Sequence, residues 1–168
     1  IDAAHDAARH KAAVILSDGV CHIDNIPNIA DVSTALEILS GLGAVVRRVD
    51  KHAVEIDPRS IFTHTVPHDL ARHMRASYYF IGSLLGRYGE ARVSMPGGCN
   101  FGVRPIDQHL KGFRMLGANV EQMGGRIKAK ADLLTGTDVV FDCVSVGATI
   151  NVMLAAAKAH GTTIIYNA

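Results

Sequence analysis

The sequence predicts a mixed α and β (α+β) fold built from a repeated unit, and two observations support this. Helical segments with one apolar face alternate along the chain with short strand-like runs. Glycines also recur at nearly constant spacing, because Gly19, Gly89 and Gly161 lie 70 and 72 residues apart and each precedes a strand-like run. Leu42-Gly43-Ala44 recurs 74 residues later as Leu116-Gly117-Ala118, closing a helix and opening a strand in both places. These landmarks predict a duplicated architecture.

The spacing of apolar residues predicts four helices. Their approximate ranges are 31–42, 69–87, 105–116 and 146–159. Asp31 is expected to cap the first helix. Pro105 suits the first position of the third helix, where the missing proline N–H would have no partner in any case.

Short strand-like runs separate these helices, and together they define the repeat. Their approximate ranges are 20–26, 44–49, 53–56, 91–95, 119–122, 127–131, 139–142 and 162–166. Each unit reads helix, strand, helix, strand, strand, and its apolar face must be covered by its neighbours, which predicts packing around a shared axis. We expect one domain over residues 1–168, with units at roughly 5–60, 69–142 and 145–168, the last one truncated.

The composition excludes several classes of function. The chain is 48% hydrophobic, and 17 basic against 16 acidic side chains give a formal net charge of +1. Because the numbers of basic and acidic side chains are nearly equal, the charge indicates neither a nucleic-acid partner nor an anionic membrane. The aromatic content of 5%, without tryptophan, also argues against a stacking platform for single strands. No apolar run approaches the ~20 residues of a membrane span, and we expect no signal peptide.

The three cysteines and nine histidines predict no metal site and no disulfide framework. Cys21, Cys99 and Cys143 are widely spaced and form no CxxC pair, which favours a reducing, cytoplasmic setting. His64 and His68 have a helical spacing, but the intervening proline interrupts a helix there. Cys21 and Cys143 are expected to pack in the core.

The most unusual segment is the glycine-rich stretch that links the run at 91–95 to the helix predicted from Pro105. Cys99 lies in it, close to Arg104 and to a helix N-terminus, and both favour a thiolate. The alternative is a glycine-rich turn with an incidental cysteine. Arg104 suits bidentate binding of a carboxylate or phosphate, or an ion pair with Asp107. Asp107 and His109 are candidates to contact a polar ring, or are simply solvated.

A second candidate segment extends from Asp142 to Thr149. Ser145 stands where a helix N-cap belongs, and Gly147 permits a close approach to the backbone. Free N–H groups at such a terminus suit a diphosphate, although plain capping explains the same residues. Arg75, on the second predicted helix, faces either a cleft or solvent.

Four segments together resemble the UDP-N-acetylglucosamine 1-carboxyvinyltransferases, which are enolpyruvyl transferases. These segments are Met74-Arg75-Ala76-Ser77, Pro96-Gly97-Gly98-Cys99 with Arg104-Pro105-Ile106-Asp107-Gln108-His109, Ser145-Val146-Gly147-Ala148-Thr149, and the ending from Gly161 to Ala168. The resemblance covers nearly the whole chain and is most specific at the cysteine segment. It implies an inverse α/β barrel of βαβαββ-type units, with helices inside and sheets outside, and a second domain of the same enzyme.

The resemblance also implies the reaction. Enolpyruvyl is transferred from phosphoenolpyruvate to the 3-hydroxyl of UDP-N-acetylglucosamine, and phosphate is released, as the first committed step of peptidoglycan precursor synthesis. The active site would lie between the two domains, without a metal or organic cofactor. The present chain would be a fragment that is inactive alone, because part of the phosphoenolpyruvate site belongs to the other domain.

By the same resemblance, individual residues acquire roles. Cys99 matches the general acid, which is also the residue captured by fosfomycin, and Arg104 would neutralise phosphate or carboxylate charge. The other matched positions are substrate-binding. They comprise Arg75 for the sugar nucleotide, Arg104, Pro105, Ile106, Asp107, Gln108 and adjacent His109 for the uridine nucleotide, and Ser145, Val146 and Gly147 for the diphosphate.

The chain departs from the family pattern in three places. His5-Asp6 stands where the family has a Lys-Asn pair that contacts phosphoenolpyruvate, Cys143 replaces a lysine of many members, and Tyr166 replaces a usual glutamate. Three alternatives also stay open. They are a non-catalytic nucleotide-sugar binding module of the same fold, an enolpyruvyl transferase acting on shikimate 3-phosphate, and a structural interaction domain with an unreactive Cys99.

Overall fold

The structure is a computed structural model that describes residues 10–95 and 106–168, with Arg75 described by its backbone alone. The helices and strands, in chain order, are β1 (Cys21–Ile23), α2 (Ala30–Leu42), β2 (Val45–Arg48), β3 (Val54–Asp57), η1 (Pro58–Ser60), α3 (His68–His73), η2 (Arg75–Tyr78), α4 (Tyr79–Tyr88), β4 (Glu90–Ser94), α5 (Asp107–Met115), β5 (Asn119–Met123), β6 (Arg126–Lys130), β7 (Asp138–Val140), α6 (Val146–Ala156) and β8 (Ile164–Tyr166). The predicted mixture of helices and strands is confirmed.

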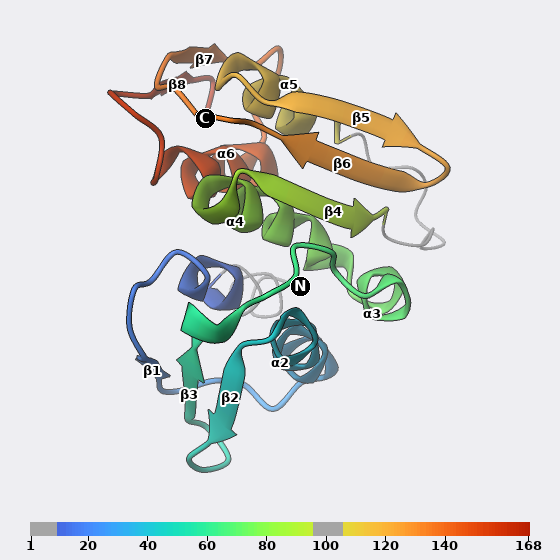
Figure 1. Cartoon of the computed structure of the whole chain (residues 1–168), viewed down its shortest axis with the longest axis vertical. Coiled ribbons are helices and arrows are strands. Elements are labelled where there is room, and N and C mark those ends of the chain that lie inside the picture. The colour runs from blue at the N-terminus through green and yellow to red at the C-terminus, as the bar shows by residue number, and fades with distance from the viewer. Residues whose placement is uncertain (1–9, 96–105) are drawn as a thin grey trace.

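Two antiparallel three-stranded sheets have the same strand order. In the lower half of Figure 1 the order is β1-β3-β2, beside α2, and in the upper half it is β4-β6-β5, over α4, α5 and α6. In each sheet the third strand in sequence lies between the other two. β7 and β8 form a separate parallel pair.

The turns that lead into the two hairpins also match. Gly43 and Gly117 have φ values of 107° and 95°, which are left-handed conformations that favour glycine at a helix end. The residue after each glycine makes the same backbone hydrogen bond to the preceding helix. The N–H of Ala44 donates to the carbonyl of Leu39, and the N–H of Ala118 donates to the carbonyl of Phe113, each at 3.0 Å. The recurring triplet therefore marks a recurring local structure.

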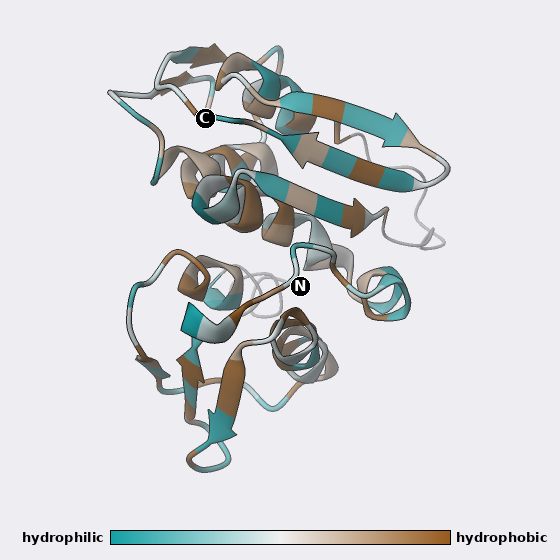
Figure 2. Cartoon of the chain, viewed as in Figure 1, coloured by the Kyte–Doolittle hydropathy of each residue, from teal (hydrophilic) through white to brown (hydrophobic). Residues whose placement is uncertain are grey.

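The three helices beneath the upper sheet pack closely because small residues lie at their crossings. A Cβ on Gly82 of α4 would overlap the backbone oxygen of Asn151 on α6, and one on Gly112 of α5 would overlap the side chain of Val152. Helix α6 therefore lies in contact with both α4 and α5. β6 above them alternates exposed and buried residues along its length, visible as alternating bands in Figure 2, whereas β5 buries only Val120.

The prediction of one continuous helix over 69–87 is wrong. α3 and α4 are separated by Met74, whose backbone is extended (φ −116°, ψ 113°), and by the short 3-10 helix η2. Met74 is fully buried, and the Ser77 hydroxyl donates to the carbonyl of Ala71 at 3.0 Å. Packing and this local hydrogen bond outweigh helix propensity here.

Three further expectations need correction. Asp31 does not cap α2, since Ile29 is the N-cap and Asp31 lies in the first turn. The strand predicted over 20–26 ends at Ile23, just before Asn25 adopts a positive φ of 55°. Cys143 is exposed rather than in the core, because β7 ends at Val140 and the chain bends away. Cys21 is half-buried against the core, as its strand position suggests.

Residues 10–14 are helical, and they were not among the four predicted helices. Its polar residues interrupt the apolar periodicity, yet the side chain of Lys11 is fully buried. Burial, together with the charge of Arg48, lowers the pKa of Lys11 to about 8. A pattern of apolar positions cannot reveal a helix that buries a lysine.

Candidate functional site

The N-terminal turns of α5 and α6 lie against each other, and they carry most of the residues predicted to bind the nucleotide. The contact is between His109 and Gly147: a Cβ on Gly147 would lie 3.4 Å from Cε1 and 3.5 Å from Nε2 of the imidazole. The same position lies 3.5 Å from the hydroxyl of Tyr78, at the end of η2. Three chain segments thus meet at the first turn of α6.

Ser145 caps α6, as predicted. Its hydroxyl accepts the N–H of Ala148 at 3.3 Å, and its carbonyl accepts the N–H of Thr149 at 2.9 Å. In the described part of the chain, the N–H groups of Val146 and Gly147 have no acceptor. The exposed side chain of Val146 leaves this turn open to solvent, where two free N–H groups and the helix dipole can hold an anion.

His109 is buried, which corrects the expectation that it lies exposed on the first turn of α5. It is 6% exposed, and its ring packs edge-on against Tyr78 with centroids 4.9 Å apart. Burial lowers the pKa of His109 to about 4, against a smaller raising effect of the nearby Asp107 carboxylate. The imidazole is therefore neutral at physiological pH and contributes a hydrogen bond rather than a charge.

Gln108 connects the start of α5 to the turn that precedes α6. Its Nε2 donates to the carboxylates of Asp107 and Asp142, each at 3.0 Å, and its Oε1 accepts the backbone N–H of Asp142 at 3.0 Å. Lys111, one turn further along α5, forms an ion pair with the same carboxylate of Asp142. Hydrogen bonds from Lys111 and then Gln108 hold the pKa of Asp142 below its usual value.

The predicted site residues thus fall into two groups. The structure brings together Asp107, Gln108, His109, Ser145, Val146 and Gly147, with Ile106 as the half-buried N-cap of α5. Cys99, Arg104, Pro105, the side chain of Arg75 and the pair His5-Asp6 lie outside the described residues. The roles of the second group stay predictions.

Three residues of this region were missed by sequence reasoning: Tyr78, Lys111 and Asn151. Of these, only Asn151 could have been identified from the sequence, because it is a single amide in the otherwise apolar run from Ile150 to Ala157. A polar residue inside such a run is typical of a buried hydrogen-bonded network. The contributions of Tyr78 and Lys111 depend on tertiary contacts that no local pattern encodes.

Among residues 10–95 and 106–168, no group of three or more His, Cys, Asp or Glu side chains could hold a metal ion. No helix within those ranges is long and apolar enough to cross a membrane.

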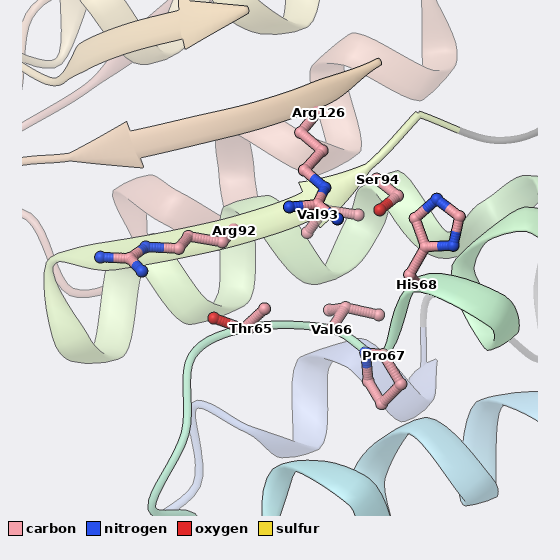
Figure 3. A pocket seen from close by; sticks show the side chains of 8 residues that line it. All are labelled: Thr65, Val66, Pro67, His68, Arg92, Val93, Ser94 and Arg126. Carbon is pink, nitrogen blue, oxygen red and sulfur yellow. The ribbon is translucent and has the colours of Figure 1, made fainter. Parts of the chain in front are cut away.

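A separate hollow of about 230 Å³ lies between the chain before α3 and the strands β4 and β6 (Figure 3). Its lining residues are Thr65, Val66, Pro67, His68, Arg92, Val93, Ser94 and Arg126. Arg92 in its lining pairs with Glu90. It contains none of the predicted site residues.

Comparison with known proteins decides the family. The family model described as EPSP synthase (3-phosphoshikimate 1-carboxyvinyltransferase) matches residues 6–168. The chain belongs to the EPSP synthase family. Within this family it is 53% identical over 156 residues to a UDP-N-acetylglucosamine 1-carboxyvinyltransferase of Clostridium botulinum, and 51% identical over 158 residues to one of Streptococcus pneumoniae. The resemblance inferred from the motifs is confirmed.

The match covers 93% of this chain in both cases, but only 37% and 38% of the two relatives. Superposition on solved structures shows that this chain has the EPSP synthase fold. An enolpyruvyl transferase from Streptomyces tendae superposes with a TM-score of 0.81 at 22% identity, over 96% of this chain and 38% of that one. An EPSP synthase from Acinetobacter baumannii gives a TM-score of 0.74 at 16% identity, over 95% and 38%.

Proposed function

We propose that this chain carries the sugar-nucleotide side of a UDP-N-acetylglucosamine 1-carboxyvinyltransferase. The enzyme would transfer enolpyruvyl from phosphoenolpyruvate to the 3-hydroxyl of UDP-N-acetylglucosamine in the cytoplasm, for peptidoglycan precursors. One observation carries the proposal: the segment matched to the nucleotide (Asp107 to His109) and the segment matched to the diphosphate (Ser145 to Gly147) meet at one helix N-terminus. Two segments about 40 residues apart in sequence converge as one ligand requires.

The chemistry is an addition followed by an elimination. Cys99, as general acid, would supply the proton that adds to the methylene carbon of phosphoenolpyruvate, while the sugar 3-hydroxyl gives its proton to a base and its oxygen bonds to C2. Return of a proton from the same carbon to the Cys99 thiolate and loss of phosphate from C2 then restore the double bond. Arg104 would stabilise the charge on phosphate or carboxylate as the tetrahedral carbon forms. The thiol would also be the target of fosfomycin.

The proposed architecture extends the observed sheets. We propose an inverse α/β barrel with helices inside and sheets outside, in which the two three-stranded sheets belong to complete units and β8 to a third. The matching strand orders and the matching hydrogen bonds after Gly43 and Gly117 support a repeated unit. A second domain of the same enzyme, consistent with the 37% coverage of the relative, would complete the phosphoenolpyruvate site.

A second candidate is a nucleotide-sugar binding module without turnover. The substitution of His5-Asp6 for the family's Lys-Asn pair favours it, because the lysine would contact phosphoenolpyruvate and not the nucleotide. Both candidates keep the site at the first turn of α6.

Two measurements on the full-length protein test the proposal. Calorimetry should show binding of UDP-N-acetylglucosamine, and addition of phosphoenolpyruvate should then release phosphate. Binding without phosphate release would establish the module instead. Absence of binding would contradict both candidates. A Cys99→Ala variant serves as the control, since it should bind the nucleotide sugar as before and lose labelling by fosfomycin.

A further inference from the structure

Asn151 joins three helical segments through one buried amide. Its side chain is fully buried on α6. The Oδ1 atom accepts the backbone N–H of Gly82 on α4 at 3.0 Å, and Nδ2 donates to the carbonyl of Tyr78 at 2.9 Å. The same Nδ2 lies 3.1 Å from Nδ1 of His109 on α5. Every polar atom of the amide therefore has a partner.

The two backbone partners fix which way the amide faces. A backbone N–H can only donate and a carbonyl can only accept, so a reversed amide would oppose N–H to the N–H of Gly82 and oxygen to the carbonyl of Tyr78. Both contacts would become repulsive in a buried site. The second hydrogen of Nδ2 must therefore point at His109.

This orientation decides the protonation state of the imidazole. Since Nδ2 carries only hydrogens, Nδ1 of His109 must accept, and the single proton of the neutral ring lies on Nε2. A proton on Nδ1 would meet the amide hydrogen head-on, and this adds to the effect of burial, which by itself lowers the pKa of His109. Of the described charged or titratable groups, Asp107 on the same helix and Tyr78 on η2 lie near the ring. The Asp107 carboxylate raises the pKa of His109, but burial lowers that pKa by more.

We propose that Asn151 is a positioning residue that keeps His109 neutral with its proton on Nε2, where the N–H faces the first turn of α6. The Nε2 atom and the Tyr78 hydroxyl each lie 3.5 Å from the position that a Cβ on Gly147 would take. This step rests on the proposed function: the Nε2–H of His109 donates a hydrogen bond to the bound UDP-sugar. Asn151 would act on the ligand only through this histidine.

The first arm of the test measures the imidazole itself in the full-length protein. NMR of ¹⁵N-histidine-labelled protein should show His109 as the Nε2–H tautomer, without titration down to about pH 5. In Asn151→Asp, one carboxylate oxygen can still accept from Gly82, and the other would face both the Tyr78 carbonyl, at some cost in stability, and Nδ1 of His109, where it would attract a proton. The tautomer should then invert and the pKa of His109 should rise by at least 1 unit. A wild-type Nδ1–H tautomer, or an unchanged ring in Asn151→Asp, would overturn the positioning role.

The second arm measures the affinity for UDP-N-acetylglucosamine against pH. Wild-type affinity should be constant between pH 5.5 and 8. Asn151→Asp should bind about tenfold more weakly at pH 8 and recover at low pH, where protonation returns a hydrogen to Nε2. An equal loss at every pH would mean a structural role only and would overturn the inference. If the wild-type protein binds no UDP-sugar although the tautomer is as stated, the proposed function fails and the positioning of His109 stands.

Discussion

Gln108 holds Asp142 by two groups at once: its Oε1 accepts the backbone N–H of Asp142, and its Nε2 donates to the carboxylate, both at 3.0 Å. Asp142 lies three residues before Ser145, the cap of α6. The start of α5 is thereby tied to the turn that positions α6. Gln108 itself is only 7% exposed, whereas the Asp142 carboxylate is exposed, so the buried amide sets the relative position of the two helix ends from the protein side.

We predict that Gln108→Ala lowers the free energy of unfolding by about 1–3 kcal/mol, because it leaves the backbone N–H of Asp142 without its partner. Urea denaturation measures the change. Lys111→Ala is the matched control, since it removes the exposed ion pair to the same carboxylate. It should cost clearly less than Gln108→Ala. Equal costs for the two variants would show that the backbone contact is unimportant.

The free energy of unfolding should fall at acidic pH, because the buried imidazole of His109 must then be protonated. Its pKa is lowered to about 4 in the folded chain, against 6.5 for an unperturbed histidine. The unfolded chain thus binds the proton first, so the stabilising contribution is complete above about pH 6.5 and is lost as the pH falls towards 4. The loss is on the order of 3 kcal/mol. In His109→Gln, the free energy of unfolding should change distinctly less over this range, and an identical pH profile in both proteins would contradict the assignment.

Gly82→Ala should destabilise the crossing of α4 and α6. The added methyl group would overlap the backbone of Asn151, which cannot move without shifting α6, and a cost of about 1–3 kcal/mol is expected. Gly19→Ala is the control, since no heavy atom lies within 4 Å of its Cβ position. Thermal unfolding of both variants measures the difference. Equal melting temperatures would contradict the close packing of the two helices.

Gly147→Ala should separate binding from folding. Its Cβ would meet His109 and Tyr78 at 3.4–3.5 Å, which is ordinary contact, so the free energy of unfolding should be unchanged or slightly higher. The methyl group would, however, occupy the approach to the free N–H groups of α6. We expect the affinity for UDP-N-acetylglucosamine to fall at least about tenfold, measured by calorimetry. Undiminished affinity would exclude this turn as the diphosphate site.

Much of the fold was predictable because local signals and tertiary packing agree. The hairpins after Gly43 and Gly117 follow from a positive φ that glycine tolerates, and Ser145 caps α6 through a hydrogen bond to a residue three positions away. The break at Met74 was not predictable, since burial of that side chain in the core overrides a helical pattern.

The site was predicted only where its residues form short motifs. Gln108 and Ser145 lie within such motifs. Their surroundings become visible only in the folded chain: Lys111, on α5 itself, pairs with Asp142, and Tyr78, on η2, packs against His109. The burial of His109 was also invisible, because it results from packing of α5 against η2 and α6 rather than from its position in a helical turn.

The central claim, that this chain binds a UDP-sugar acceptor for enolpyruvyl transfer, is tested most directly by acceptor choice. Phosphate release from phosphoenolpyruvate by the full-length protein should be measured with UDP-N-acetylglucosamine and, separately, with shikimate 3-phosphate. We predict release with the first acceptor and none above background with the second. Release with shikimate 3-phosphate alone would contradict the account.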